Sequence, residues 1–142
     1  MAHAEKGYAF FDHTADIGIR AVGTTLAEVL IGLGQGLTEL LIEDSQLEAR
    51  ETRPIVLTAK DAESLTLQWM QELLFWFSTD RFVPVIYELE TVTPTSVQGR
   101  VRGDRFDPMR HTQGREVKAI TRHALEVQER DGQWSGQVIV DI

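Results

Sequence analysis

The sequence predicts an α+β fold, a two-layer sandwich in which two main helices cover one face of a mixed β-sheet. Two observations lead to this class. Residues 25–41 and 61–77 carry apolar side chains at helical spacing, and each segment stands alone among segments that alternate as strands do. The chain has no internal repeat, low-complexity tract or linker, so we expect one domain over residues 1–142.

The first predicted strand is the segment DIGIRAVG at residues 16–23. Apolar residues at positions 17, 19 and 21 alternate with Gly18 and Arg20, as on a strand with one buried face. A second extended piece precedes it, beyond the polar break from Asp12 to Asp16. We expect Gly23 to end the strand.

The first helix is predicted to begin at Thr25, because Thr25 and Glu28 have capping-box spacing. Its apolar stripe consists of Leu26, Val29, Leu30, Leu33, Leu37, Leu40 and Leu41. Gly32, Gly34 and Gly36 interrupt this stripe, and each costs up to about 1 kcal/mol relative to alanine. We expect them to let a neighbouring element approach closely or to permit a kink.

The second helix is predicted over residues 61–77, with Asp61 or Ser64 as its cap. One face carries Leu65, Trp69, Leu73 and Trp76, and Met70, Leu74 and Phe77 lie beside it. A helix this apolar is expected to be buried. Its aromatic residues are therefore interpreted as core and not as a cofactor pocket.

The remaining segments are predicted strands. They are IVLTA before the second helix, VPVIYELETV after it, and then VQGRVRG, HALEVQE and SGQVIVDI. Asp131 and Gly132, between the last two, form a hairpin-turn signal.

Charge and composition exclude several functions. The formal net charge is -8, with 22 acidic and 14 basic residues, and such a surface repels phosphate backbones. The absence of cysteine excludes disulfides, thiolate metal sites and a cysteine nucleophile. No apolar run is long enough to span a membrane, and the first residues do not resemble a signal peptide, so we expect a cytoplasmic protein.

The segment Asp12-His13-Thr14-Ala15-Asp16 is the first candidate site. Because four residues separate the two carboxylates, they are expected to share a face in either regular conformation. They would repel each other unless a cation or a basic group lay between them. The alternative is a turn in which these polar side chains bond to the nearby backbone.

The second candidate site is the C-terminal segment. Residues 138–140 form a short apolar run typical of a buried strand, and Asp141 and the carboxylate of Ile142 follow directly. Carboxylates and carbonyls fixed at the end of a strand suit a hard divalent ion such as Ca²⁺ or Mg²⁺. The alternative is a pair of solvated anionic groups without a ligand.

The third candidate is a concentration of positive charge in residues 104–123. It includes Arg105, Arg110, Arg115, Lys118 and Arg122. These residues could receive a phosphate or an acidic partner, or they could be the charged side chains of a solvated edge strand. The chain has no GxSxG, HExxH, Walker A or dinucleotide motif, and no nucleophile–base pair can be assembled, so no feature of the sequence calls for an enzyme.

With these residues in view, the chain resembles the archease family. The resemblance rests on four segments spread over the sequence in the family's order: FDHTADIGIRAVG (11–23), ESLTLQWMQELLFWF (63–77), GREVKAITRH (114–123) and VIVDI (138–142).

The resemblance implies an accessory protein that activates the tRNA-splicing RNA ligase of the RtcB family by promoting its guanylylation and repeated turnover, and that meets tRNA only through the ligase. It also implies a divalent-metal site formed by Asp16, Asp141 and Ile142, with Asp12 as a further candidate ligand. Ca²⁺ is the expected ion, ahead of Mg²⁺ or Mn²⁺. His13, Arg115 and Lys118 are candidate partner contacts.

Two other functions remain open at this stage. One is a chaperone or modulator of tRNA-modifying enzymes such as a tRNA methyltransferase, a role also associated with the family. The other is a metal-dependent hydrolase that would use Asp12, His13, Asp16 and Asp141. An accessory protein should turn over nothing by itself, and this separates it from the hydrolase.

Overall fold

The computed structural model describes residues 7–13, 16–43 and 46–142. The elements follow in this order: β1 (Tyr8–His13), β2 (Asp16–Gly23), α2 (Leu26–Leu41), β3 (Ile42–Glu43), β4 (Glu51–Thr58), α3 (Ala62–Asp80), β5 (Phe82–Thr93), β6 (Ser96–Arg105), β7 (Thr112–Gln113), β8 (Ala119–Arg130) and β9 (Gln133–Asp141).

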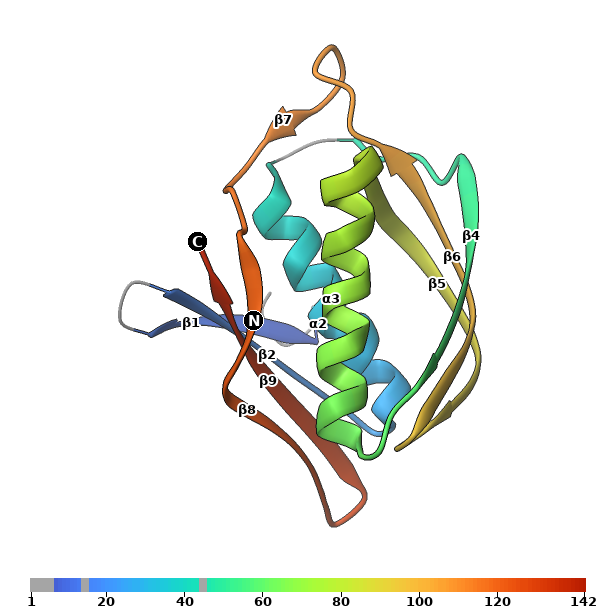
Figure 1. The fold of residues 1–142 in the computed structure, drawn as a ribbon, viewed down its shortest axis with the longest axis vertical. Helices are drawn as coiled ribbons and strands as arrows, with labels where there is room; N and C mark the ends of the chain where they lie inside the picture. Colours follow the sequence, from blue (N-terminus) through green and yellow to red (C-terminus); the bar gives the residue numbers. More distant parts are fainter. Residues whose placement is uncertain (1–6, 14–15, 44–45) are drawn as a thin grey trace.

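The two helices lie between two antiparallel sheets (Figure 1). One sheet has the strand order β1-β2-β9-β8 and the other has the order β4-β6-β5, while β3 and β7 form a short ribbon. The α+β class with two main helices is confirmed. The expectation of a two-layer sandwich with one mixed sheet is corrected, because the helices lie between two sheets and every strand pair in the described part of the chain is antiparallel.

The position of β6 explains why the expectation of a mixed sheet fails. Strands β4 and β5 are joined by α3, a connection typical of parallel neighbours. Both strands pair with β6 in antiparallel fashion, so they run in the same direction without touching as neighbours. The third strand of this sheet, which follows them in the sequence, is inserted between them.

Helix α2 begins at the predicted cap. The Thr25 hydroxyl accepts a hydrogen bond from the Glu28 amide at 3.1 Å. The Glu28 carboxylate reaches back one residue further than the capping box predicts, and it accepts from the Thr24 amide at 2.7 Å. The Glu28 amide, one of the donors that the helix leaves unpaired at its start, is thereby satisfied, as is the Thr24 amide just before the cap.

The glycines of α2 allow close packing, as expected. A Cβ atom at Gly32 would lie 2.8 Å from the Gly7 carbonyl oxygen, and one at Gly36 would lie 2.7 Å from Ile19 Cγ2. A Cβ atom at Gly34 would lie 2.5 Å from the Tyr87 hydroxyl. Gly32 and Gly36 therefore bring α2 against the side of β1 and β2, and Gly34 brings it against β5.

Replacing Gly36 with alanine is expected to destabilise the protein by about 1–3 kcal/mol through overpacking. Alanine favours the helix by about 1 kcal/mol, but Ile19 is fully buried and cannot move away freely. Urea unfolding measures the change. Gln35→Ala, at an exposed position of the same helix, is the control and should be close to neutral. A more stable Gly36→Ala variant would contradict the close approach.

Helix α3 begins after Asp61, whose carboxylate accepts a hydrogen bond from the Ser64 amide at 2.8 Å. The predicted apolar face is buried, with Leu65 and Trp69 fully enclosed and Leu73 and Trp76 nearly so. The prediction that the aromatic residues of this helix belong to the core is confirmed for Trp69, Trp76 and Phe77, whereas Phe75 is exposed.

The hairpin between β8 and β9 turns at Asp131 and Gly132, as predicted. Both residues have positive φ, 55° and 78°, the conformation of a two-residue hairpin turn. Closer to the start of β8, the pairing with β9 shifts between Thr121 and Glu126, and Ala124 within this bulge has a φ of 54°. The bulge lies on the strand that carries the end of the GREVKAITRH segment.

Candidate functional site

The ends of β1, β2 and β9 meet at one edge of the four-stranded sheet. Ile17 pairs with Val140, and continuing this register places Asp16 opposite Asp141. Figure 1 shows the end of β9, marked C, on the same side of the molecule as the neighbouring ends of β1 and β2. The structure therefore places two acidic residues from opposite ends of the sequence at the ends of neighbouring strands. We call Asp16, Asp141 and Ile142 the acidic tip.

The position of Asp12 corrects the expectation drawn from its spacing. Asp12 pairs with Ile17 across β1 and β2, so it shares the face of Ile17 and of the fully buried Val140. Asp16 and Asp141, each one residue further along its strand, lie on the other face. The spacing rule fails because the chain reverses between Asp12 and Asp16, which puts the two residues on different strands.

The acidic tip offers only oxygen ligands. Asp141 is exposed, while Asp16 and Ile142 are half-buried. Within the described residues, no group of three or more histidine, aspartate or glutamate side chains is gathered closely enough to hold a metal ion. The two facing carboxylates would therefore need an oxygen of Ile142, or Asp12 from the other face, to complete a site for a hard cation.

The candidate partner contacts lie at different distances from the tip. The Lys118 amide donates a hydrogen bond to the Asp141 carbonyl at 2.8 Å, so Lys118 is directly beside it. His13 pairs with Asp16 through the strand register, and its side chain lies outside the described part of the structure. Arg115 adjoins the end of α2 instead, with its amide bonded to the Leu40 carbonyl at 2.7 Å.

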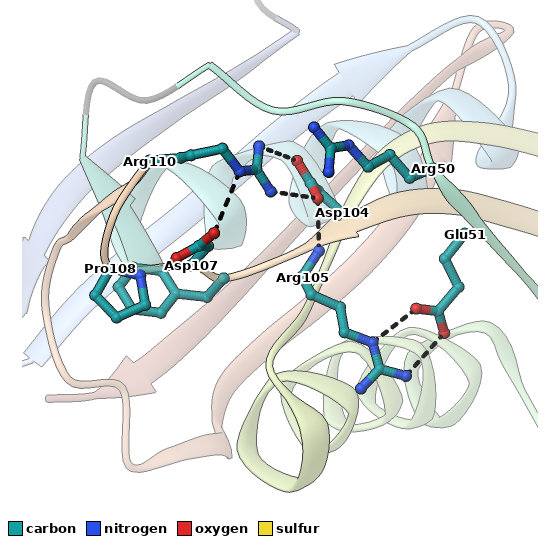
Figure 2. A pocket seen from close by; sticks show the side chains of 8 residues that line it. Arg50, Glu51, Asp104, Arg105, Asp107, Pro108 and Arg110 are labelled. Carbon is teal, nitrogen blue, oxygen red and sulfur yellow. Dashed lines mark hydrogen bonds and ion pairs between the residues drawn. The ribbon is translucent and has the colours of Figure 1, made fainter.

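A pocket of about 510 Å³ lies beside the chain reversal after β6 and is lined by charged residues. Figure 2 shows Arg110 between Asp104 and Asp107, and Arg105 turned toward Glu51. Three arginines line the pocket, Arg50, Arg105 and Arg110, and three carboxylates match them, Glu51, Asp104 and Asp107.

This balance bears on two of the five basic residues of this region, Arg105 and Arg110. Arg105 Nε lies 2.9 Å from Glu51, and Arg110 lies 3.2 Å from Asp104 and 3.4 Å from Asp107. Arginines neutralised in this way offer little attraction to a phosphate. Arg105 and Arg110 are therefore part of a charged network and not of a free basic patch.

Asp104 holds this network together. It is 2% exposed and accepts hydrogen bonds from the amides of Glu48 and Arg105, both at 2.9 Å, and from the guanidinium of Arg110. Burial alone raises the pKa of Asp104, but the bonds from Arg110 and the two amides outweigh it, and the pKa falls to about 2.

His111 is also buried and holds the chain reversal after β6 through two hydrogen bonds. Its Nδ1 accepts a hydrogen bond from the Asp107 amide at 2.9 Å, so the ring proton lies on Nε2, which is 3.1 Å from the Gln46 carbonyl. Sequence reasoning missed Asp104 and His111 as a structural pair, because their partners at residues 46–48 are remote in the chain.

These features define a small α+β protein with carboxylates at paired strand ends and a charge-balanced pocket. The chain belongs to the archease family, described as the archease protein family (MTH1598/TM1083), whose model matches residues 8–142. The resemblance inferred from the sequence is confirmed. No helix in the described ranges has the length and apolarity to cross a membrane.

Curated relatives and solved structures agree with this assignment. Protein archease of Methanosarcina mazei is 32% identical over all of both chains, and that of Pyrococcus abyssi is 30% identical over 96% of this chain and 99% of its own. The solution structure of protein 1598 from Methanobacterium thermoautotrophicum is 32% identical, with a TM-score of 0.80, covering 96% of this chain and 99% of that one.

A crystal structure from Thermotoga maritima, described as an archease and possible chaperone, has a TM-score of 0.68 at 20% identity and covers 93% of this chain and 94% of that one. At this identity the likeness concerns the fold alone.

Proposed function

We propose that this protein is an accessory protein, not an enzyme, that activates a tRNA-splicing RNA ligase of the RtcB family. The observation that carries the proposal is the match to the archease family over residues 8–142. In this function the protein promotes guanylylation of the ligase and its repeated turnover. The net charge of -8 supports contact with the ligase, and with tRNA only through it.

The acidic tip is the proposed cation site. The carboxylates of Asp16 and Asp141, opposite each other by register, would bind Ca²⁺, or else Mg²⁺ or Mn²⁺, together with an oxygen of Ile142. Asp12 is a further ligand candidate from the opposite face. A bound cation would supply positive charge at a tip that is otherwise anionic.

The ligase is proposed to contact the same end of the molecule. Lys118 is bonded through its amide to Asp141, and His13 pairs with Asp16, so both adjoin the tip. Arg115 precedes Lys118 on the same segment. A partner that reaches the cation would meet these residues.

A modulator of tRNA-modifying enzymes is the second candidate. The family resemblance implies this role as well, and a protein of the same fold from Thermotoga maritima is described as a possible chaperone. Guanylylation of the ligase and methylation of tRNA, each measured with and without this protein, separate the two functions. An effect on methylation alone would favour the second candidate.

Asp16→Asn and Asp141→Asn test the proposed site. Each is expected to weaken Ca²⁺ binding, measured by calorimetry, at least about tenfold, and to reduce stimulation of ligase turnover in parallel. Each variant keeps the shape of the side chain and removes the charge that a hard cation requires.

Asp131→Asn is the matched control for these two variants. It makes the same change in the turn that precedes β9, far from the tip along the strand, at a positive φ that asparagine tolerates. The control should bind and stimulate as the unaltered protein does. Undiminished binding and stimulation in both tip variants would refute the site.

A further inference from the structure

A row of contacts made by side chains crosses the four-stranded sheet on the face opposite the helices. The Arg20 guanidinium carbon lies 4.6 Å from the centre of the Phe11 ring. Arg20 also donates to Gln137 Oε1, from Nη2 at 2.8 Å and from Nε at 3.2 Å. Gln137 Nε2 donates to the Ala124 carbonyl at 2.9 Å. We call Phe11, Arg20, Gln137 and Ala124 the transverse strap, because it joins β1, β2, β9 and β8 in that order.

The strap lies next to the acidic tip, on the same face of the sheet. Phe11 pairs with Gly18, and a Cβ atom at Gly18 would lie 2.1 Å from the Phe11 ring, so the ring rests on the bare backbone. Gly18 in turn pairs with Ile139, which is fully buried without belonging to the main hydrophobic cluster of the described residues. Gly18 and Ile139 are two residues from Asp16 and Asp141, on the same face.

The strap also crosses the bulge in β8. Between Thr121 and Glu126 the backbone pairing of β8 with β9 is interrupted, and Ala124 lies within this interruption. The bond from Gln137 to the Ala124 carbonyl ties the bulge to β9 where the ladder does not. The start of β8, which lies beside Asp141, is therefore tied to β9 both by its own pairing and by the bond at Ala124.

We infer that Arg20 and Gln137 are positioning residues of the acidic tip. The backbone register alone fixes β2 against β9, the strands that carry Asp16 and Asp141. The strap adds the outer strands, whose ends carry Asp12 on β1 and adjoin Lys118 on β8. The inference rests on the proposed cation site, and it concerns how the surroundings of that site are held.

A purely electrostatic role for Arg20 predicts the opposite result. Arg20 is four residues from Asp16 on one strand, roughly 13 Å at about 3.3 Å per residue. This exceeds the Debye length of about 8 Å at physiological ionic strength. Removing its positive charge would leave cation affinity unchanged or raise it slightly, whereas loss of the strap lowers it.

The test compares Arg20→Ala, Gln137→Ala and the double variant in the full chain, with Ca²⁺ affinity measured by calorimetry. Each single variant is expected to bind about three- to tenfold more weakly, the equivalent of one hydrogen bond. The double variant should be no weaker than the stronger single effect, because the residues act as one unit. Arg20→Lys should not restore affinity, since lysine lacks the planar group that contacts both Phe11 and Gln137.

Arg100→Ala is the matched control. Arg100 is an exposed arginine on the other sheet, paired with Glu88 at 3.2 Å, and its loss should leave affinity unchanged. Equal losses in Arg100→Ala and Arg20→Ala would overturn the inference, because any surface arginine would then have the same effect.

Amide hydrogen exchange in the absence of cation supplies the second measurement. Both strap variants should exchange faster in residues 8–13 and 119–124. If the unaltered protein binds no cation, the proposed cation site fails and the positioning inference falls with it, while the exchange data still decide whether the strap holds the outer strands. If binding depends on Asp16 and Asp141 but both strap variants keep full affinity, the positioning role is overturned, whatever their exchange rates.

Discussion

Replacing Trp69 with alanine is expected to lower the free energy of unfolding by about 3–5 kcal/mol. Trp69 is fully buried, and its indole Nε1 donates to the Leu30 carbonyl at 2.8 Å, which joins α3 to α2. Its ring also lies 5.8 Å from that of Tyr87 on β5. Alanine would leave a cavity where both helices meet a sheet, and would remove this hydrogen bond.

Two further variants separate the causes of this loss. Trp69→Phe keeps an aromatic ring but removes the donor, so it should be less destabilised than Trp69→Ala. Phe75→Ala removes an aromatic side chain that is 58% exposed on the same helix and should change stability much less. Urea unfolding followed by far-UV circular dichroism measures all three. A stable Trp69→Ala variant that no longer stimulates the ligase would instead place Trp69 at a partner surface.

The local elements were predictable because their causes are local. The leucine stripe of α2 and the apolar face of α3 repeat at helical spacing, and the capping contacts of Thr25 and Asp61 span three residues. The turn at Asp131 and Gly132 follows from conformations that aspartate and glycine adopt readily. In each case the determining interaction lies within a few positions of the sequence.

The arrangement of the sheets was not predictable in this way. Insertion of β6 between β4 and β5 depends on which strand edges pair, and the period-two pattern of a strand does not identify its neighbours. The same limit applies to the transverse strap, because nothing local to Arg20 indicates that it meets Gln137.

For the candidate site, the positions of the acidic residues at strand ends were predictable, but their arrangement in space was not. Strand patterns located Asp16 and Asp141 at strand ends, but the expectation that they meet came from the family resemblance. The register of β2 and β9 ends at Ile17 and Val140, one residue before Asp16 and Asp141, so the two lie at neighbouring strand ends. The assignment of Asp12 to the face of Asp16 was wrong, because a hairpin reverses the chain between them. A spacing rule applies only within one continuous element.

Replacing Asp104 with asparagine is expected to destabilise the protein by about 3 kcal/mol at neutral pH. The buried carboxylate accepts from two backbone amides and from Arg110, whose charge would lose its partner. Asparagine has a single acceptor oxygen and an amide group that would face donors. The loop that contains Asp107 and His111 should loosen first, because these contacts hold its base.

The destabilisation should depend on pH. The pKa of Asp104 is about 2 in the folded protein, against an ordinary value of 3.8. Because folding lowers this pKa, the ionised carboxylate contributes stability above about pH 4, and that contribution disappears as the pH falls through the folded pKa. By linkage it amounts to about 2 kcal/mol. The stability difference between the unaltered protein and Asp104→Asn should therefore be constant above about pH 5 and should shrink below pH 4.

Urea unfolding at a series of pH values from 7 down to 3 measures this difference. Subtracting one variant from the other removes the contribution of other carboxyl groups, such as Glu51 and Asp80, whose pKa values hydrogen bonds from Arg105 and Arg53 also lower. Asp107→Asn is the matched control, because Asp107 contacts the same Arg110 but is 43% exposed, and its effect should be smaller. A difference for Asp104→Asn that stayed the same across the whole range would show that shape, and not the buried charge, makes Asp104 necessary.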